Sequence, residues 1–154
     1  MRMSFNGAPE IRATREQVWN AILDPQLVAA SAGVVESVEE IDPTHFKVIA
    51  GLGIGALKIR FTLNVELFDL VEGQSAKMRA RGKAPGSTLD ATTSFRLEDA
   101  APGVIRLVWE ANSDVGGTVA SVGARLLEGT ARKLAEQFFK DFAETVSRQA
   151  AGSA

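Results

Sequence analysis

Residues 117–148 read GTVASVGARLLEGTARKLAEQFFKDFAETVSR, and this segment decides the fold. It has no proline, and its apolar or small side chains recur in steps of three and four, which predicts an amphipathic α-helix. These positions are Val119, Gly123, Leu126, Leu127, Ala131, Leu134, Phe138, Phe142 and Thr145. Such a helix would be roughly 45–50 Å long at about 1.5 Å per residue, and propensity alone would not stabilise it. Its apolar stripe must therefore lie against another hydrophobic surface.

The composition excludes several classes of protein. The chain has 154 residues, a formal net charge of -2 and no cysteine. We expect one domain over residues 1–149 and a frayed end at residues 150–154. The lack of cysteine excludes disulfides, thiolate catalysis and cysteine-ligated zinc, and the charge gives no broad basic surface for nucleic acid. With no hydrophobic signal segment and no long apolar run, we expect a cytoplasmic protein.

Two short helices are expected after a first strand at residues 3–12. Thr14 and Gln17 form a capping box at the start of the first helix, because each side chain can bond a free backbone amide there. Asp24 and Pro25 end that helix. Proline suits a first helical turn, so a second helix is predicted over residues 25–31.

The middle of the chain reads as strand. Apolar and polar side chains alternate most clearly over residues 56–67, and other segments separated by turn sequences alternate in the same way. These other segments are residues 34–41, 45–50, 75–83, 88–98 and 104–115. A run of hairpins indicates an antiparallel meander. We therefore predict an α+β fold in which a seven-stranded antiparallel sheet wraps around the long C-terminal helix.

A glycine-rich segment, residues 51–55, joins two of these strands. A phosphate-binding loop would have to lead from a strand into a helix, whereas here a strand follows. Two interpretations stay open for the segment. It is either a flexible connection or, through Gly51, Gly53 and Gly55, a gate at the mouth of a cavity.

Small inward-facing side chains predict a cavity between the sheet and the helix. They lie on the later strands and face the first half of the helix: Ala76, Ala80, Gly82, Ala91, Thr93, Ala111 and Ser113. Protein interiors are normally filled, so small residues facing small residues leave either a closer approach or a pocket. We predict an apolar pocket because bulky neighbours hold the layers apart. The predicted ligand-binding residues are Phe61, Leu63, Met78, Leu89, Ala91, Trp109, Ala111, Gly123, Leu126 and Leu127.

No catalytic or metal-binding pattern stands out, so we predict no catalytic residue and no metal site. His45 is the only histidine and is expected in solvent, because no further ligand accompanies it. Trp19 is expected in the core, whereas Phe139 falls off the helical stripe and could contact a partner or a membrane. A basic row reads as a solvated strand face, with contact to anionic lipid headgroups as the alternative. Its residues are Lys77, Arg79, Arg81 and Lys83.

Several short motifs carry a resemblance to known proteins. They are Phe5-Asn6-Gly7, Val18-Trp19, Asp24-Pro25, residues 27–30, residues 51–58 with Arg60-Phe61, Asp114-Val115-Gly116-Gly117, residues 123–127 and residues 131–139. The order of elements resembles the helix-grip fold of the START-like (SRPBCC) superfamily. More specifically, the motifs resemble the CoxG family, which is named for the G subunit of carbon monoxide dehydrogenase, over nearly the whole chain.

This resemblance implies a non-enzymatic protein that binds a lipid or a quinone in its cavity and needs no cofactor. It also implies a partner, a molybdenum hydroxylase of the carbon monoxide dehydrogenase type. The role would be in maturation, membrane recruitment or electron-acceptor delivery, with peripheral contact at the inner face of the membrane. Two alternatives stay open. One is a polyketide cyclase or aromatase, which would need ionisable side chains in the pocket; the other is a docking protein whose cavity is incidental.

Overall fold

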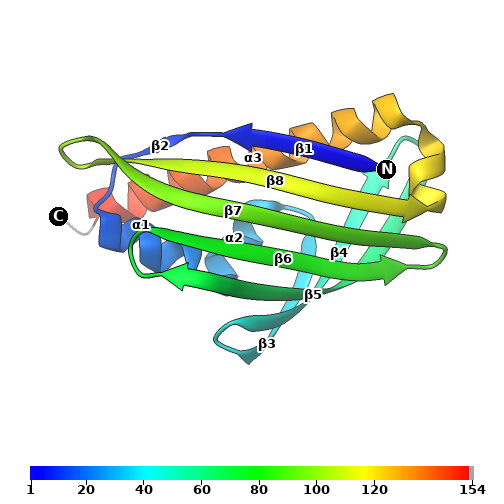
Figure 1. Ribbon diagram of the computed structural model, residues 1–154, viewed down its shortest axis with the longest axis horizontal. Coiled ribbons are helices and arrows are strands. Elements are labelled where there is room, and N and C mark those ends of the chain that lie inside the picture. The colour runs from blue at the N-terminus through cyan, green and yellow to red at the C-terminus, as the bar shows by residue number, and fades with distance from the viewer. Residues whose placement is uncertain (153–154) are drawn as a thin grey trace.

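A computed structural model describes residues 1–152 and shows a curved antiparallel sheet with helices on one face (Figure 1). The helices are α1 (Arg15–Ile22), α2 (Pro25–Ala32), the short 3-10 helix η1 (Thr118–Val122) and α3 (Ala124–Gly152). The strands are β1 (Arg2–Gly7), β2 (Glu10–Ile11), β3 (Val35–Asp42), β4 (His45–Ile54), β5 (Leu57–Val71), β6 (Ser75–Ala84), β7 (Ser87–Ala101) and β8 (Val104–Gly117).

The sheet is the predicted meander, and its continuous path has the order β1-β8-β7-β6-β5-β4-β3. The predicted first strand is divided into β1 and β2, and both pair with β8. Pro9 lies at the division, since proline has no N–H for the ladder. Its carbonyl still accepts a hydrogen bond from the Leu107 amide at 2.9 Å. The predicted α+β helix-grip architecture is therefore confirmed.

Both short helices form where the sequence predicts them. Thr14 accepts the Gln17 amide at 3.1 Å, and the Gln17 side chain accepts the Thr14 amide at 2.8 Å, which completes the capping box. Asp24 caps α2 by accepting the amides of the two residues after Pro25. Gly33 ends α2 with a φ of 69°. This left-handed conformation favours glycine and fixes the direction in which the chain enters β3.

The long helix begins at Ala124, later than predicted. Strand β8 continues to Gly117, whose φ is 83°, and the chain then forms η1 and passes Gly123 with a φ of 108°. A side chain at Gly117 would also collide with the Gly86 carbonyl oxygen. These two glycines therefore separate the strand from the helix. At the other end α3 continues to Gly152, so part of the expected frayed end is helical, while residues 153–154 lie outside the described residues.

The glycine-rich segment belongs to a hairpin. Gly51 pairs with Arg60 and Gly53 pairs with Lys58 in the β4–β5 ladder. Only Gly55 lies in the turn, with a φ of 59°. The interpretation as a flexible connection was wrong, because the backbone pairing of both strands continues to the turn.

The core consists of two clusters, and α3 packs on both. The first is rich in aromatic residues and includes Trp19, as predicted. In it Phe139 stacks on Trp109, with ring centroids 4.1 Å apart and an interplanar angle of 10°. Phe139 is only 7% exposed, so its predicted surface position was wrong. The buried residues of α3 are Leu127, Phe139, Phe142, Ala143 and Val146, so the buried stripe is shifted around the helix from the predicted one. The second cluster joins Leu127 of α3 to Phe61 of β5.

Gly7 provides a test of this packing, because it pairs with Trp109 in the β1–β8 ladder. A Cβ atom at Gly7 would lie 2.7 Å from the indole Nε1, so the indole would have to move. We expect Gly7→Ala to lower the free energy of unfolding in urea by about 1–3 kcal/mol. Gly53→Ala is the matched control, since nothing lies within 4 Å of a Cβ there. Equal stability of the two variants would contradict the packing.

Candidate functional site

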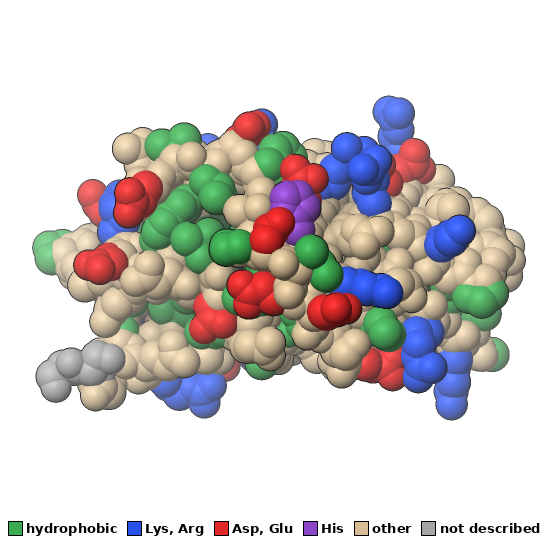
Figure 2. Space-filling view, turned by 90° about the horizontal axis from the view of Figure 1, so that it is seen from below, with side chains coloured by type: hydrophobic (Ala, Val, Ile, Leu, Met, Phe, Trp, Pro, Cys, Tyr) green, Lys and Arg blue, Asp and Glu red, His purple; other side chains and the backbone are tan. Residues whose placement is uncertain are grey.

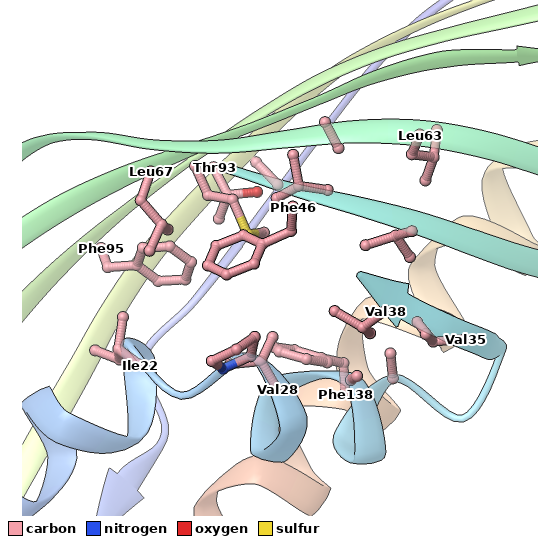
Figure 3. Close-up of a pocket in the computed structure, with 18 of the residues that line it drawn as sticks. Ile22, Val28, Val35, Val38, Phe46, Leu63, Leu67, Thr93, Phe95 and Phe138 are labelled. Carbon is pink, nitrogen blue, oxygen red and sulfur yellow. The ribbon is translucent and has the colours of Figure 1, made fainter. Parts of the chain in front are cut away.

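A cavity of about 310 Å³ lies between the sheet and the helices and is partly open to the surface. Figure 2 shows hydrophobic side chains gathered in a hollow on one face of the molecule, with acidic side chains around it and the single histidine near its margin. Figure 3 shows the interior, where side chains of the sheet face side chains of the helices. Small-molecule sites usually have volumes of about 300–1,000 Å³, so this cavity is of ligand size.

The inner face of the sheet forms one wall of the cavity. The ladder places Leu67, Met78, Thr93 and Ala111 in one row across four strands. The neighbouring row includes Ala80, and all five residues line the cavity. Alanine side chains in a sheet do not reach the helix layer, whereas the longer side chains beside them do. The hollow therefore follows from small residues placed among large ones.

Helices α2 and α3 form the opposite wall. Helix α3 contributes Phe138 and Phe139, and α2 contributes Val28 and Ala29. Figure 3 shows Val28 and Phe138 directed toward the sheet. Phe138 meets Phe139 edge to face, with centroids 4.8 Å apart. Aromatic edges and faces attract one another, so this contact fixes the orientation of the Phe138 ring. It thereby determines which face of the ring lines the cavity.

Strand β3 and the first part of β4 close the remaining side. Val35 and Val38 of β3 line the cavity together with Phe46 and Val48 of β4. The β3–β4 ladder has shifts in register near both of its ends. Such irregularities bend a strand, so β3 can curve toward α2 and complete the wall.

The wall is apolar except at two residues. Among the lining residues only Thr93, with its hydroxyl, and Trp109, with its indole N–H, carry a side-chain oxygen or nitrogen, and none of these residues is ionisable. An apolar cavity of about 150 Å³ can hold one benzene molecule, so a cavity about twice this size has room for roughly two fused rings or a comparable hydrocarbon. The site is thus suited to an uncharged, largely apolar molecule.

The structure brings together only some of the ten predicted ligand-binding residues. Four line the cavity: Leu63, Met78, Trp109 and Ala111. The other six lie elsewhere. Phe61 and Leu127 are buried in the second cluster, and Leu89 packs against that cluster. Ala91 is half-buried beside Ala80, Gly123 precedes α3, and Leu126 is 45% exposed. Gly51, Gly53 and Gly55 do not line the cavity either. Ligand contact itself stays a prediction for all of them.

The cavity lies nearer the middle of α3 than predicted. Side chains of the second cluster, such as Val119, fill the space beside the first half of the helix. The prediction missed the contribution of α2, although Val28, Ala29 and Ala32 lie about one helical turn or less apart in the sequence. It also missed Ala135, a small residue one turn before Phe139. Both signals are visible in the sequence, but nothing local shows that these two helices face one cavity.

The basic row of β6 lies on the outer face of the sheet and is partly neutralised. Arg79 donates two hydrogen bonds to Asp90, at 3.1 and 2.9 Å, and these bonds lower the pKa of the Asp90 carboxyl. Lys77 forms an ion pair with Asp69 at 3.3 Å. Exposed pairs of this kind add little stability, but they reduce the positive charge available to a lipid surface. Membrane contact through this row stays a prediction.

His45 is exposed and lies at the β3–β4 turn. Its Nδ1 atom is 2.9 Å from Asp42 Oδ1, and this hydrogen bond lowers the pKa of the Asp42 carboxyl. Within residues 1–152, His, Cys, Asp and Glu side chains form no group of three that could hold a metal ion. Among the same residues, no helix combines the length and the apolar character needed to cross a bilayer.

Solved structures share this architecture along almost the whole chain. A conserved protein from Geobacillus kaustophilus has a TM-score of 0.86 at 26% identity, and the match covers 95% of this chain and 96% of that one. The Zhui aromatase/cyclase from Streptomyces sp. R1128 has a TM-score of 0.71 at 13% identity, covering 97% and 96%. A START superfamily protein from Mycobacterium smegmatis has a TM-score of 0.66 at 11% identity, covering 95% and 98%.

These likenesses confirm the START-like fold, and for the two structures with low identity they show the fold alone. No curated protein matches the chain significantly. The family model for the G subunit of carbon monoxide dehydrogenase (CoxG) matches residues 7–147, which include both cavity walls. On this match, the chain belongs to the CoxG family.

Proposed function

We propose that this protein is a non-enzymatic carrier of a hydrophobic small molecule, either a lipid or a quinone. The observation that carries the proposal is the cavity of about 310 Å³, whose lining is apolar except for the Thr93 hydroxyl and the Trp109 indole N–H. Burial of apolar ligand surface stabilises a complex by about 25 cal/mol per Å². A ligand that buries roughly 200 Å² would therefore gain about 5 kcal/mol from the hydrophobic effect. The cavity walls supply this term without any charged contact.

Family membership supports the choice of partner. We propose that the carrier serves a molybdenum hydroxylase of the carbon monoxide dehydrogenase type. Its role would be maturation of that enzyme, its recruitment to the membrane or delivery of an electron acceptor. Delivery fits the cavity best, because only this role requires the protein to enclose a hydrophobic molecule and release it.

The lining residues favour a carrier over a cyclase. The Streptomyces aromatase/cyclase has the same fold, so the architecture permits catalysis. Acid–base catalysis needs a titratable group within hydrogen-bond reach of the reacting atoms. Here the lining consists of hydrocarbon side chains, one thioether, one indole and one hydroxyl. Met78 lines the cavity, but the ionisable residues on either side of it in the sequence, Lys77 and Arg79, point to the outer face of the sheet. There Arg79 pairs with Asp90.

The direct test is extraction of the purified protein with organic solvent and analysis of the extract by mass spectrometry. We expect a neutral lipid or quinone in a molar amount comparable to the protein, because an apolar cavity retains such a molecule during purification. The measurement is repeated after delipidation and incubation with lipids or quinones. Absence of ligand in both experiments would count against the carrier function.

Helix α2 allows a matched pair of variants. Ala29 lines the cavity, whereas the next residue, Ala30, is exposed on the other side of the helix. We expect Ala29→Phe to fill the cavity and weaken binding of the fluorescent probe N-phenyl-1-naphthylamine by about tenfold or more, which corresponds to about 1.4 kcal/mol. Ala30→Phe should leave the affinity unchanged. Thermal unfolding checks that both variants are folded.

The same pair distinguishes a carrier from a docking protein. If the cavity is incidental, Ala29→Phe will still capture the hydroxylase and support its activity in cells. If the protein acts as a carrier, this variant will retain capture but lose the activity that depends on delivery. Equal affinity of both variants for the probe would show that the cavity is not the binding site.

A further inference from the structure

Thr93 carries the one hydroxyl in the cavity wall, where the indole N–H of Trp109 is the other polar group. It lies in β7, the third strand from the β1 edge, between Met78 of β6 and Ala111 of β8 in the ladder. Figure 3 shows its oxygen pointing into the cavity, close to Phe46. The hydroxyl therefore faces the interior of the cavity.

The hydroxyl groups around the cavity differ in their partners. The Ser31 hydroxyl donates to the Leu27 carbonyl at 3.0 Å, and the Ser113 hydroxyl donates to the Met3 carbonyl at 3.4 Å. Both hydroxyls are thus used within the fold. Thr93 makes no side-chain hydrogen bond with any of the described residues, and its side chain is only half-buried although it lies under the helices. Its accessible surface must face the cavity.

An unpaired hydroxyl in an apolar site has a consequence for binding. Placing a purely hydrocarbon ligand against it would remove it from water without giving it a partner, which costs free energy. A ligand oxygen at the same point would accept a hydrogen bond from the Thr93 hydroxyl and avoid that cost. A charged group could not use the site in this way, because no ionisable side chain lines the cavity to pair with it.

We propose that Thr93 binds the polar atom of the ligand and selects neutral molecules with a carbonyl or hydroxyl oxygen at one end of an apolar body. This inference rests on the proposed carrier function and specifies the ligand class. Such a ligand lies with its oxygen inward, over the middle of the sheet, and its hydrocarbon part toward the mouth. Thr93 is thus a specificity-determining residue, whereas the remaining walls contribute shape and apolar contact.

Two bicyclic probes of nearly equal size test the proposal. They are 1-tetralone, which has a ketone oxygen, and tetralin, which has none. Affinities are measured by displacement of N-phenyl-1-naphthylamine from wild type, Thr93→Val and Thr93→Ser. Valine keeps the shape of threonine and removes the hydroxyl, while serine retains the hydroxyl. We expect Thr93→Val to weaken 1-tetralone binding by about 3- to 10-fold, the effect of one neutral hydrogen bond.

The ratio of the affinity for 1-tetralone to the affinity for tetralin tests the role of Thr93. Wild type and Thr93→Ser should prefer 1-tetralone, and Thr93→Val should lose the preference because tetralin then binds as well or better. An unchanged ratio in Thr93→Val, with both probes bound, would overturn the role of Thr93 and leave the carrier function intact. Failure of wild type to bind any of the three compounds would overturn the carrier function and this assignment together. Thermal unfolding of each variant confirms that the affinities refer to folded protein.

Discussion

The contact between Trp109 and Phe139 sets the distance between the long helix and the sheet. Their rings stack with centroids 4.1 Å apart, so α3 cannot come closer at this point. At the other end of the sheet, Leu127 packs in the cluster that contains Phe61. A helix is stiff over this length, so small residues between the two contacts cannot close the gap. The two contacts that hold α3 on the sheet therefore also keep the cavity between them open.

Local patterns in the sequence were sufficient for the architecture. Strict alternation located β5 and the later strands, and the Thr14 capping box located α1, because these signals depend only on neighbouring residues. The start of α3 was predicted wrongly. Its helical periodicity extends back to Gly117, but two glycines with positive φ form a turn there. Periodicity describes which face would be buried in a helix and does not show that the helix forms.

The candidate site was predicted less completely because it depends on tertiary placement. Met78 and Trp109 were identified since both are large, inward-facing residues next to small ones. The wall formed by α2 was missed, because its position over the sheet follows from packing against α3 and from the turn at Gly33. Leu126 was included wrongly, since the stripe of α3 is centred on Leu127 and Phe139. Side-chain size predicted that a cavity exists, but not between which elements.

The distribution of charge in this chain favours the proposed carrier function over catalysis. In this chain the strand alternation directs charged side chains to the outer face, where pairs such as Arg60 with Glu36 and Arg79 with Asp90 neutralise one another. The cavity wall keeps apolar groups, one hydroxyl and one indole N–H. An enzyme stabilises charge that develops in a transition state and needs polar groups already in position. A carrier must bind its ligand without changing it and then release it, and apolar walls meet both requirements because they provide affinity without reactive groups.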